Sequence, residues 1–185
     1  MSYERLEGTG IQWPCPGVNH PGTPLLHSGG FARGKGCFIS VHYNPPPEVS
    51  DDDYPLILMT GRSLFQFHTG TMTRRSPTLQ GQLDEAYAEV NPGDAKTLGI
   101  TDGMKIAVES RRGIIRVAAR ITERVSPGTV FIPFHFAEAA ANILTLRTLD
   151  PKSKIPELKV SAVKMKREEL TTLNEIKKSN GEMKE

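Results

Sequence analysis

A succession of short alternating segments between residues 54 and 134 restricts the possible folds of this chain more than any other feature. Met104, Ile106 and Val108 alternate with polar or small neighbours, which is the period-two pattern of a half-buried strand. The same alternation resumes over residues 117–121, beyond the turn residues 111–113. Further short strands are expected over residues 54–59, 87–90, 129–134 and 160–165. Because closure removes exposed strand edges, this pattern predicts a closed or nearly closed β-barrel.

One short helix is expected among these strands, over residues 91–99. Asn91 can cap its first turn, Pro92 suits the first helical position, and Gly99 can end it in a left-handed conformation. The fold class is therefore mainly β with short helices. A charged tail follows over residues 167–185, where apolar residues three apart allow a marginal amphipathic helix.

Residues 1–50 differ in character from the rest of the chain. Glycine and proline, 17 and 14 in the whole sequence, are concentrated here too densely for regular elements. Trp13, Phe31 and Phe38 nevertheless need burial, and a disordered segment predicts fewer aromatic residues. We therefore expect an irregular arm that packs on another surface, with a strand only at residues 37–43. The polar residues 50–53 place the boundary of the barrel at residue 51, and the barrel is expected to extend to residue 166.

The loop over residues 60–75 carries the chemistry that is most suggestive of a binding site. It combines glycines, hydroxyl side chains, a histidine and the three arginines Arg62, Arg74 and Arg75. Glycine allows close backbone approach, and hydroxyl, N–H and guanidinium groups donate to phosphate oxygens. These residues predict a loop that holds a large anionic cofactor. A glycine- and threonine-rich surface loop with solvated arginines is the alternative, because no P-loop pattern is present.

Several other classes of function find no support in the composition. A net charge of +2 does not indicate a nucleic-acid-binding protein, and no apolar run is long enough to cross a bilayer. Residues 1–5 lack a signal-peptide pattern, so a cytoplasmic location is expected. Two cysteines, Cys15 and Cys37, cannot form a four-cysteine cluster site, and the histidines are not at metal-ligand spacing. We therefore predict no metal ligand and no catalytic residue in this chain.

The order of several short segments resembles the C-terminal domain of molybdopterin-dependent oxidoreductases, which binds molybdopterin guanine dinucleotide. These segments are residues 55–62, 68–73, 90–95, 98–103, 110–113, 125–131 and 142–145. Residues 150–159 and the leader over residues 3–23 resemble in particular the catalytic (alpha) subunit of formate dehydrogenase. The resemblance covers about residues 3–166 and implies a double-psi β-barrel that binds a bis-molybdopterin guanine dinucleotide carrying Mo or W.

The resemblance also implies which residues contact the cofactor. They are Thr60, Gly61, Arg62, Phe65, His68, Thr69, Gly70, Thr71, Met72, Thr73, Asn91, Asp94, His135, Asn142, Thr145 and Lys159. The segment from Thr60 to Thr73 would contact pterin and phosphate, Asn91 and Asp94 the guanine end of one half, and the later residues the other half. Taken singly, His68 and His135 also suit a structural histidine, and Arg62 and Lys159 also suit surface charges.

One departure from the family concerns what this chain lacks. A whole catalytic subunit is several times longer and carries a cysteine cluster for an iron–sulfur centre and a cysteine or selenocysteine that ligates the metal. The resemblance therefore implies the C-terminal part of the enzyme, as a split subunit or an expressed fragment, inactive alone. Its partners would be a larger iron–sulfur catalytic chain and further electron-transfer subunits, for formate oxidation or CO2 reduction. The alternatives are the barrel subunit of formylmethanofuran dehydrogenase and a cofactor-free double-psi barrel that serves as an interaction module.

Overall fold

The computed structural model describes residues 2–168 and divides the chain into two compact units, Met1–Asn44 and Pro45–Glu185. Residues 169–185, most of the predicted charged tail, lie outside the described part of the chain. The second unit contains all the named strands of the described residues. The candidate site therefore has to be built on this unit.

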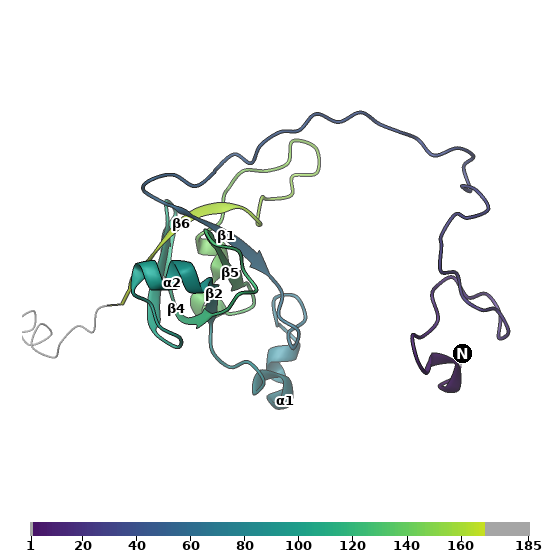
Figure 1. Cartoon of the computed structure of the whole chain (residues 1–185), viewed down its shortest axis with the longest axis horizontal. Helices are drawn as coiled ribbons and strands as arrows, with labels where there is room; N and C mark the ends of the chain where they lie inside the picture. The colour runs from purple at the N-terminus through teal and green to yellow at the C-terminus, as the bar shows by residue number, and fades with distance from the viewer. Residues whose placement is uncertain (1, 169–185) are drawn as a thin grey trace, which may run out of the picture. The chain divides into compact units, whose positions relative to one another are not determined.

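Six strands of the second unit close into a barrel in the order β1-β5-β2-β4-β3-β6 (Figure 1). Their bounds are β1 Leu56–Gly61, β2 Tyr87–Val90, β3 Lys105–Ser110, β4 Gly113–Ile121, β5 Thr129–Pro133 and β6 Ser161–Arg167. β1 pairs with β5, and β2 with β4, in parallel, whereas the other four neighbouring pairs are antiparallel. This closed mixed barrel confirms the predicted double-psi barrel class.

Short helices occupy the connections between the strands. They are η2 Thr73–Arg75, α1 Pro77–Gln80, α2 Pro92–Leu98, η3 Ala137–Ala139 and η4 Ala141–Ile143, and η1 Glu4–Leu6 lies in the first unit. Figure 1 shows α1 away from the strands, in the long excursion between β1 and β2. This excursion contains the candidate binding loop.

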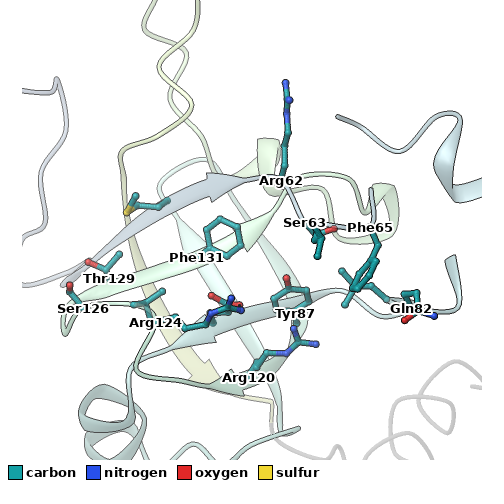
Figure 2. Close-up of a pocket in the computed structure, with 15 residues that line it drawn as sticks. Arg62, Ser63, Phe65, Gln82, Tyr87, Arg120, Arg124, Ser126, Thr129 and Phe131 are labelled. Atoms are coloured by element: carbon teal, nitrogen blue, oxygen red, sulfur yellow. The ribbon is translucent and has the colours of Figure 1, made fainter. Parts of the chain in front are cut away.

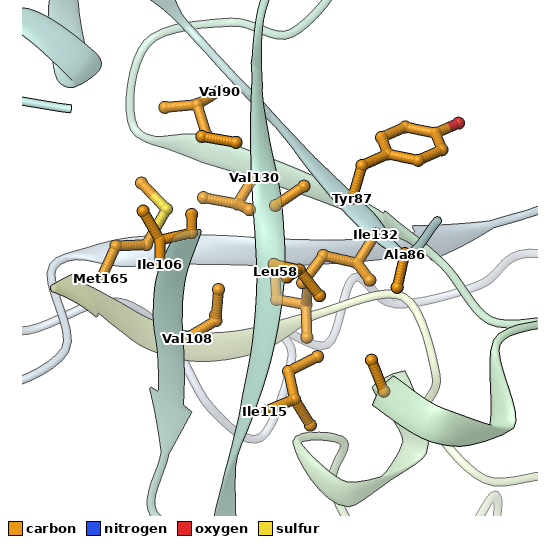
Figure 3. Close-up of a cluster of buried hydrophobic side chains, with 14 of the residues drawn as sticks. Leu58, Ala86, Tyr87, Val90, Ile106, Val108, Ile115, Val130, Ile132 and Met165 are labelled. Carbon is orange, nitrogen blue, oxygen red and sulfur yellow. The ribbon is translucent and has the colours of Figure 1, made fainter. Parts of the chain in front are cut away.

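The inward-facing residues of the strands fill the barrel. Leu58, Ile106, Val108, Val130 and Ile132 are each at most 1% exposed, and their side chains meet between the strands in Figure 3. Alternation places every second residue of a strand on this inner face, so the pattern that predicted the strands also selects the core. The packed interior leaves ligand binding to the loops and the outer surface.

Helix α2 has the predicted ends. The Asn91 side chain accepts a hydrogen bond from the Gly93 N–H at 2.9 Å, and Pro92 occupies the first turn. Gly99 closes the helix with φ 65°, in the left-handed region, and its N–H donates to carbonyl groups of the last turn. The helix prediction is confirmed, and Asn91 acts in it as the cap.

The segment before β1 is fastened to the barrel. The Glu48 carboxylate accepts hydrogen bonds from the Arg112 guanidinium, at 2.5 and 3.0 Å, and from the Ala162 N–H at 2.7 Å. Arg111 pairs with Asp51 and lies 4.5 Å from the centroid of the Tyr54 ring. Residues 45–50 therefore belong to the same compact unit as the strands.

The first unit is irregular, with local hydrogen bonds around His20. Arg5 donates to the His20 carbonyl oxygen at 2.5 Å, and the Gly22 N–H donates to His20 Nδ1 at 3.0 Å. The predicted strand at residues 37–43 is wrong for this structure, because these residues form no strand. A strand needs a partner for its backbone groups, and residues 37–43 have none among residues 2–44 of their unit.

Candidate functional site

The topology brings two long loops to one edge of the barrel. Because β1 and β5 are parallel neighbours, residues 62–75 after β1 and residues 134–145 after β5 leave from the same edge. The Phe134 N–H donates to the Gly61 carbonyl oxygen at 3.1 Å, and the rings of His68 and Phe134 lie edge to face, 5.5 Å between centroids. Two predicted segments far apart in sequence thus form one surface.

Lys159 joins this edge from a third direction. β6 is antiparallel to β1, so the residues that precede β6 lie beside the end of β1. Lys159 Nζ donates to the Thr60 carbonyl oxygen at 2.7 Å, and Thr60 Oγ1 donates to the Leu158 carbonyl oxygen at 2.5 Å. The predicted residues Thr60 and Lys159 are therefore in direct contact, and the Thr60 hydroxyl proton is used by the fold.

Gly61 is needed for packing at the end of β1. A Cβ atom at this position would lie 2.5 Å from Cε2 of Phe131, on the neighbouring strand β5. Such a contact is not compatible with an ordinary side chain, so a substitution has to displace the Phe131 ring. The requirement for glycine follows from the barrel itself.

The loop after β1 is held by its own polar groups. Thr73 Oγ1 donates to Gln66 Oε1 at 2.6 Å and accepts from the Phe67 N–H at 3.1 Å. The hydroxyls of Thr69 and Thr71 lie 3.1 Å apart. His68 and Gly70 adopt positive φ angles of 52° and 75°, which turn the chain twice within three residues. Met72, by contrast, is 69% exposed.

Arg74 connects the two loops and is committed to protein partners. Its guanidinium forms a bidentate pair with Glu138, at 2.7 and 2.9 Å, and donates to the His135 carbonyl oxygen at 3.2 Å. The hydrogen bond from Arg74 holds the pKa of Glu138 below its ordinary value. Arg74 therefore has a structural role that sequence spacing did not indicate, and its predicted role in binding an anion stays a prediction.

His135 has the most unusual environment of the predicted residues. Its side chain is 2% exposed, and neither ring nitrogen has a hydrogen-bond partner among residues 2–168. Burial lowers the pKa of His135, and the charge of Arg74 adds to this effect, so the imidazole is kept neutral. A neutral imidazole offers one donor and one acceptor, and both are unused here.

A cavity of about 580 Å³ lies beside His135, lined also by Thr69, Gly70, Thr71 and Arg74. Gln66 Nε2 and Ser63 Oγ, in the same loop, are likewise buried without a hydrogen-bond partner among residues 2–168. Buried polar groups are paired in most folded proteins, and each exception calls for an explanation. Each of these atoms is covered by protein in this structure, so a ligand in the cavity meets the side chains of Thr69, Thr71 and Arg74 first and reaches the ring of His135 only if the loops move.

Arg62 and Phe65 lie at a different cavity, of about 700 Å³, on the outer face of the barrel. Figure 2 shows Arg62 on one side of this cavity and Arg120 on the other. The Arg120 guanidinium stacks over the Tyr87 ring at 3.9 Å from its centroid, and Arg124 lies near Glu89. The loop predicted as a single contact surface thus faces two cavities.

Asn91 and Asp94 lie at the other end of the barrel. They follow β2, which is antiparallel to β5, and therefore lie near the start of β5. Asn91 Nδ2 donates to the Val125 carbonyl oxygen at 2.8 Å, and Asp94 accepts from the Gly128 N–H at 2.7 Å. Both side chains thus have structural partners, apart from the edge that holds His135.

Asn142 and Thr145 belong to the turn around η4. Thr145 is buried, and its hydroxyl donates to the Asn142 carbonyl oxygen at 3.0 Å, whereas the Asn142 side chain is exposed. Residues missed by the sequence interpretation are Gln66, Tyr87, Arg120 and Glu138. Gln66 pairs with Thr73 within its own loop, whereas the contacts of Tyr87, Arg120 and Glu138 join segments that are distant in sequence, for which no local sequence signal exists.

Residues 2–168 contain neither a candidate metal centre nor a candidate membrane-spanning helix. No three histidine, cysteine or acidic side chains in this part of the chain are grouped as metal ligands. The helices described there are all too short or too polar to span a bilayer.

The closed barrel, with donor-rich loops after β1 and β5 that line a cavity at one edge, has the architecture of a ligand-binding β-barrel domain. The chain belongs to the Molydopterin dinucleotide binding domain family, whose model matches residues 56–162. The name of this family states the kind of ligand, a molybdopterin dinucleotide.

The chain is also similar to longer proteins. It is 50% identical over 169 residues to the F420-dependent formate dehydrogenase subunit alpha of Methanocaldococcus jannaschii, covering 90% of this chain and 25% of that protein. It is 41% identical over 172 residues to the assimilatory nitrate reductase catalytic subunit of Bacillus subtilis, covering 89% and 24%. The chain therefore spans about a quarter of the length of these relatives. Acetylene hydratase from Pelobacter acetylenicus shares the fold, with a TM-score of 0.56 at 22% identity over 62% of this chain and 18% of the hydratase.

Proposed function

We propose that this chain is the C-terminal part or a split subunit of a molybdenum or tungsten formate dehydrogenase. In this role it binds a bis-molybdopterin guanine dinucleotide for formate oxidation or CO2 reduction. The observation that carries the proposal is the 50% identity to a formate dehydrogenase alpha subunit over 90% of the chain, above the 41% to a nitrate reductase. That match includes most of the arm as well as the barrel.

The residues at the barrel edge fit such a cofactor. Hydroxyls of Thr69 and Thr71 and the Lys159 ammonium group are suited to pterin and phosphate oxygens, and His135 lines the same cavity as the two threonines. The cofactor, when bound, supplies the redox chemistry, and this chain binds it, orients it and keeps water from it. In this proposal the chain contributes no catalytic residue and no metal ligand.

The remaining parts of the proposal concern the larger assembly. A larger chain would hold the iron–sulfur cluster and the ligand of the metal, and further electron-transfer subunits would accept the electrons. These partners, the choice between Mo and W, and the cytoplasmic location stay predictions.

Isolation of the tagged chain from its native cells tests this function. We expect a larger iron–sulfur chain to copurify, together with Mo or W measured by mass spectrometry, pterin measured by fluorescence after oxidation, and formate-dependent electron transfer. A chain isolated alone, without pterin or metal, would contradict the proposal and favour a cofactor-free interaction module.

Two variants separate the two cavities. His135→Leu should lower the pterin content of the isolated complex if the smaller cavity binds the cofactor, and Arg62→Ala should lower it if the larger one does. The matched control is Arg147→Ala, an exposed arginine outside both cavities. Unchanged pterin content in both test variants would remove these residues from the site.

A further inference from the structure

The segment over residues 37–43 is unusual because its sequence suits a strand and its structure leaves it unpaired. Its backbone runs without a bend or turn, after the glycines 34 and 36 and before the prolines 45–47. Phe38, Ile39, Val41 and Tyr43 are between 77% and 102% exposed. Within the first unit, described from residue 2 to residue 44, the backbone groups of this segment make no hydrogen bond.

The side chains of this segment fall on two faces, as they would on an edge strand of a sheet. With a period of two, Ile39, Val41 and Tyr43 share one face, and Phe38, Ser40 and His42 share the other. The first face is apolar except for the hydroxyl of Tyr43, and the second is mixed. β-branched and aromatic residues are also those that favour extended structure.

The barrel of this chain offers no edge for such a strand, because its six strands form a closed ring. The partner edge therefore has to come from another part of the assembly. The formate dehydrogenase relative covers 90% of this chain, so the uncovered residues are too few to exclude residues 37–43 from the match. About three quarters of that relative lies outside the match, so it has ample chain to supply a sheet.

We propose that residues 37–43 bind by β-augmentation, as an added edge strand on an open sheet of the larger catalytic chain. The main chain supplies the affinity, and the face formed by Ile39, Val41 and Tyr43 packs on the apolar core beneath that sheet. This inference rests on the proposed function, because it takes its partner from the same assembly. It also explains why these residues form no strand in this chain by itself, since the partner strand belongs to the larger chain.

Hydrogen exchange with single-residue resolution tests the mode of binding. In an added edge strand, every second N–H points to the partner and the others point away. The complex isolated from native cells should therefore show slowed exchange at alternate amides of residues 38–43, and the free chain should show none. Fast exchange at all of these amides within an intact complex would overturn the strand while leaving the proposed function in place. Failure to find any larger chain would count against the proposed function instead.

A pair of proline variants provides an independent test. Proline removes one N–H, so Ser40→Pro and Val41→Pro should differ, because only one of these residues donates to the partner. We expect about a ten-fold loss of affinity for the larger chain in one variant and a smaller loss in the other. Ser40→Ala and Val41→Ala control for the side chains. Equal losses of affinity in the two proline variants, after subtraction of the losses in the alanine controls, would refute the binding of this segment as a strand paired along one edge.

Discussion

The substitution Glu48→Gln tests how the segment before β1 is held. The Glu48 side chain is 11% exposed and accepts three hydrogen bonds, two from Arg112 and one from the Ala162 N–H. Glutamine has nearly the same shape, but one of its oxygens is replaced by an amide donor. That donor would face a guanidinium or backbone donor, so at least one hydrogen bond is lost together with the charge.

The magnitude follows from the kind of bond and its exposure. Hydrogen bonds to charged groups contribute about 1.5–3 kcal/mol, and breaking a fully buried pair costs about 3–5 kcal/mol. Arg112 keeps its hydrogen bonds to the Leu144 carbonyl oxygen, at 2.8 and 3.0 Å, so the lower range applies. We expect the free energy of unfolding to fall by about 2 kcal/mol, and Tm by about 5–10 °C.

The effect should depend on pH with a definite sign. Burial raises the pKa of Glu48, but hydrogen bonds from Arg112 and Ala162 outweigh burial and hold it below its ordinary value of 4.5. The unfolded chain therefore binds more protons as pH falls below about 5, so the stabilisation is present above 4.5 and lost as pH falls through the lower folded value. The difference between wild type and Glu48→Gln should shrink from pH 6 to pH 3.

Urea unfolding of the full chain, followed by far-UV circular dichroism, provides the measurement. Glu85→Gln is the matched control, because Glu85 pairs with Lys105 at the surface, with both side chains more than half exposed. Such a pair contributes less than about 1 kcal/mol. Equal losses for Glu48→Gln and Glu85→Gln, or a difference that does not change with pH, would refute the reasoning.

Three further substitutions test the barrel and the site by urea unfolding. Gly61→Ala should lower the free energy of unfolding by about 1–3 kcal/mol, because the added Cβ meets Phe131. Gly29→Ala is the control, since a Cβ there meets no other atom, and equal stability of the two variants would contradict the prediction. Asn91→Ala should cost about 1 kcal/mol through the lost helix cap, and an unchanged midpoint would show that water replaces it. His135→Leu should raise the stability of the free chain by about 1 kcal/mol, since it removes unpaired buried nitrogens. Because the folded pKa of His135 lies below 6.5, the wild type should lose stability from pH 7 to pH 5 relative to this variant, and parallel pH profiles would contradict the predicted shift.

The elements that were predictable from sequence are those set by neighbours in the chain. The alternation of Ile106 and Val108 and the cap signals of Asn91 and Gly99 depend on residues two to eight positions apart, and the strands and helix α2 confirm them. The prediction of a strand at residues 37–43 was wrong for this structure. Local pattern indicates that a segment can be a strand, but pairing requires another strand within reach.

The candidate site shows a similar division. Residue types alone indicated a donor-rich loop after β1, and the order of the segments carried the family resemblance. The parallel pairing of β1 with β5 brought His135 to that loop, and β6 brought Lys159 to Thr60. The same pairing of β1 with β5 brings Arg74 to Glu138, which lies 64 residues further along the chain.

The sequence by itself therefore determined the strands, the short helix and the chemical character of the loops, because these follow from local periodicity and side-chain type. Only the tertiary structure decided which polar groups have partners, because that depends on how the barrel closes. It separated Arg62 from His135 by placing them at different cavities and assigned Asn91 and Asp94 to structural contacts at the opposite end. Hydrogen-bond satisfaction is a property of three-dimensional neighbours, and it leaves the ring of His135 buried without a partner in the described chain.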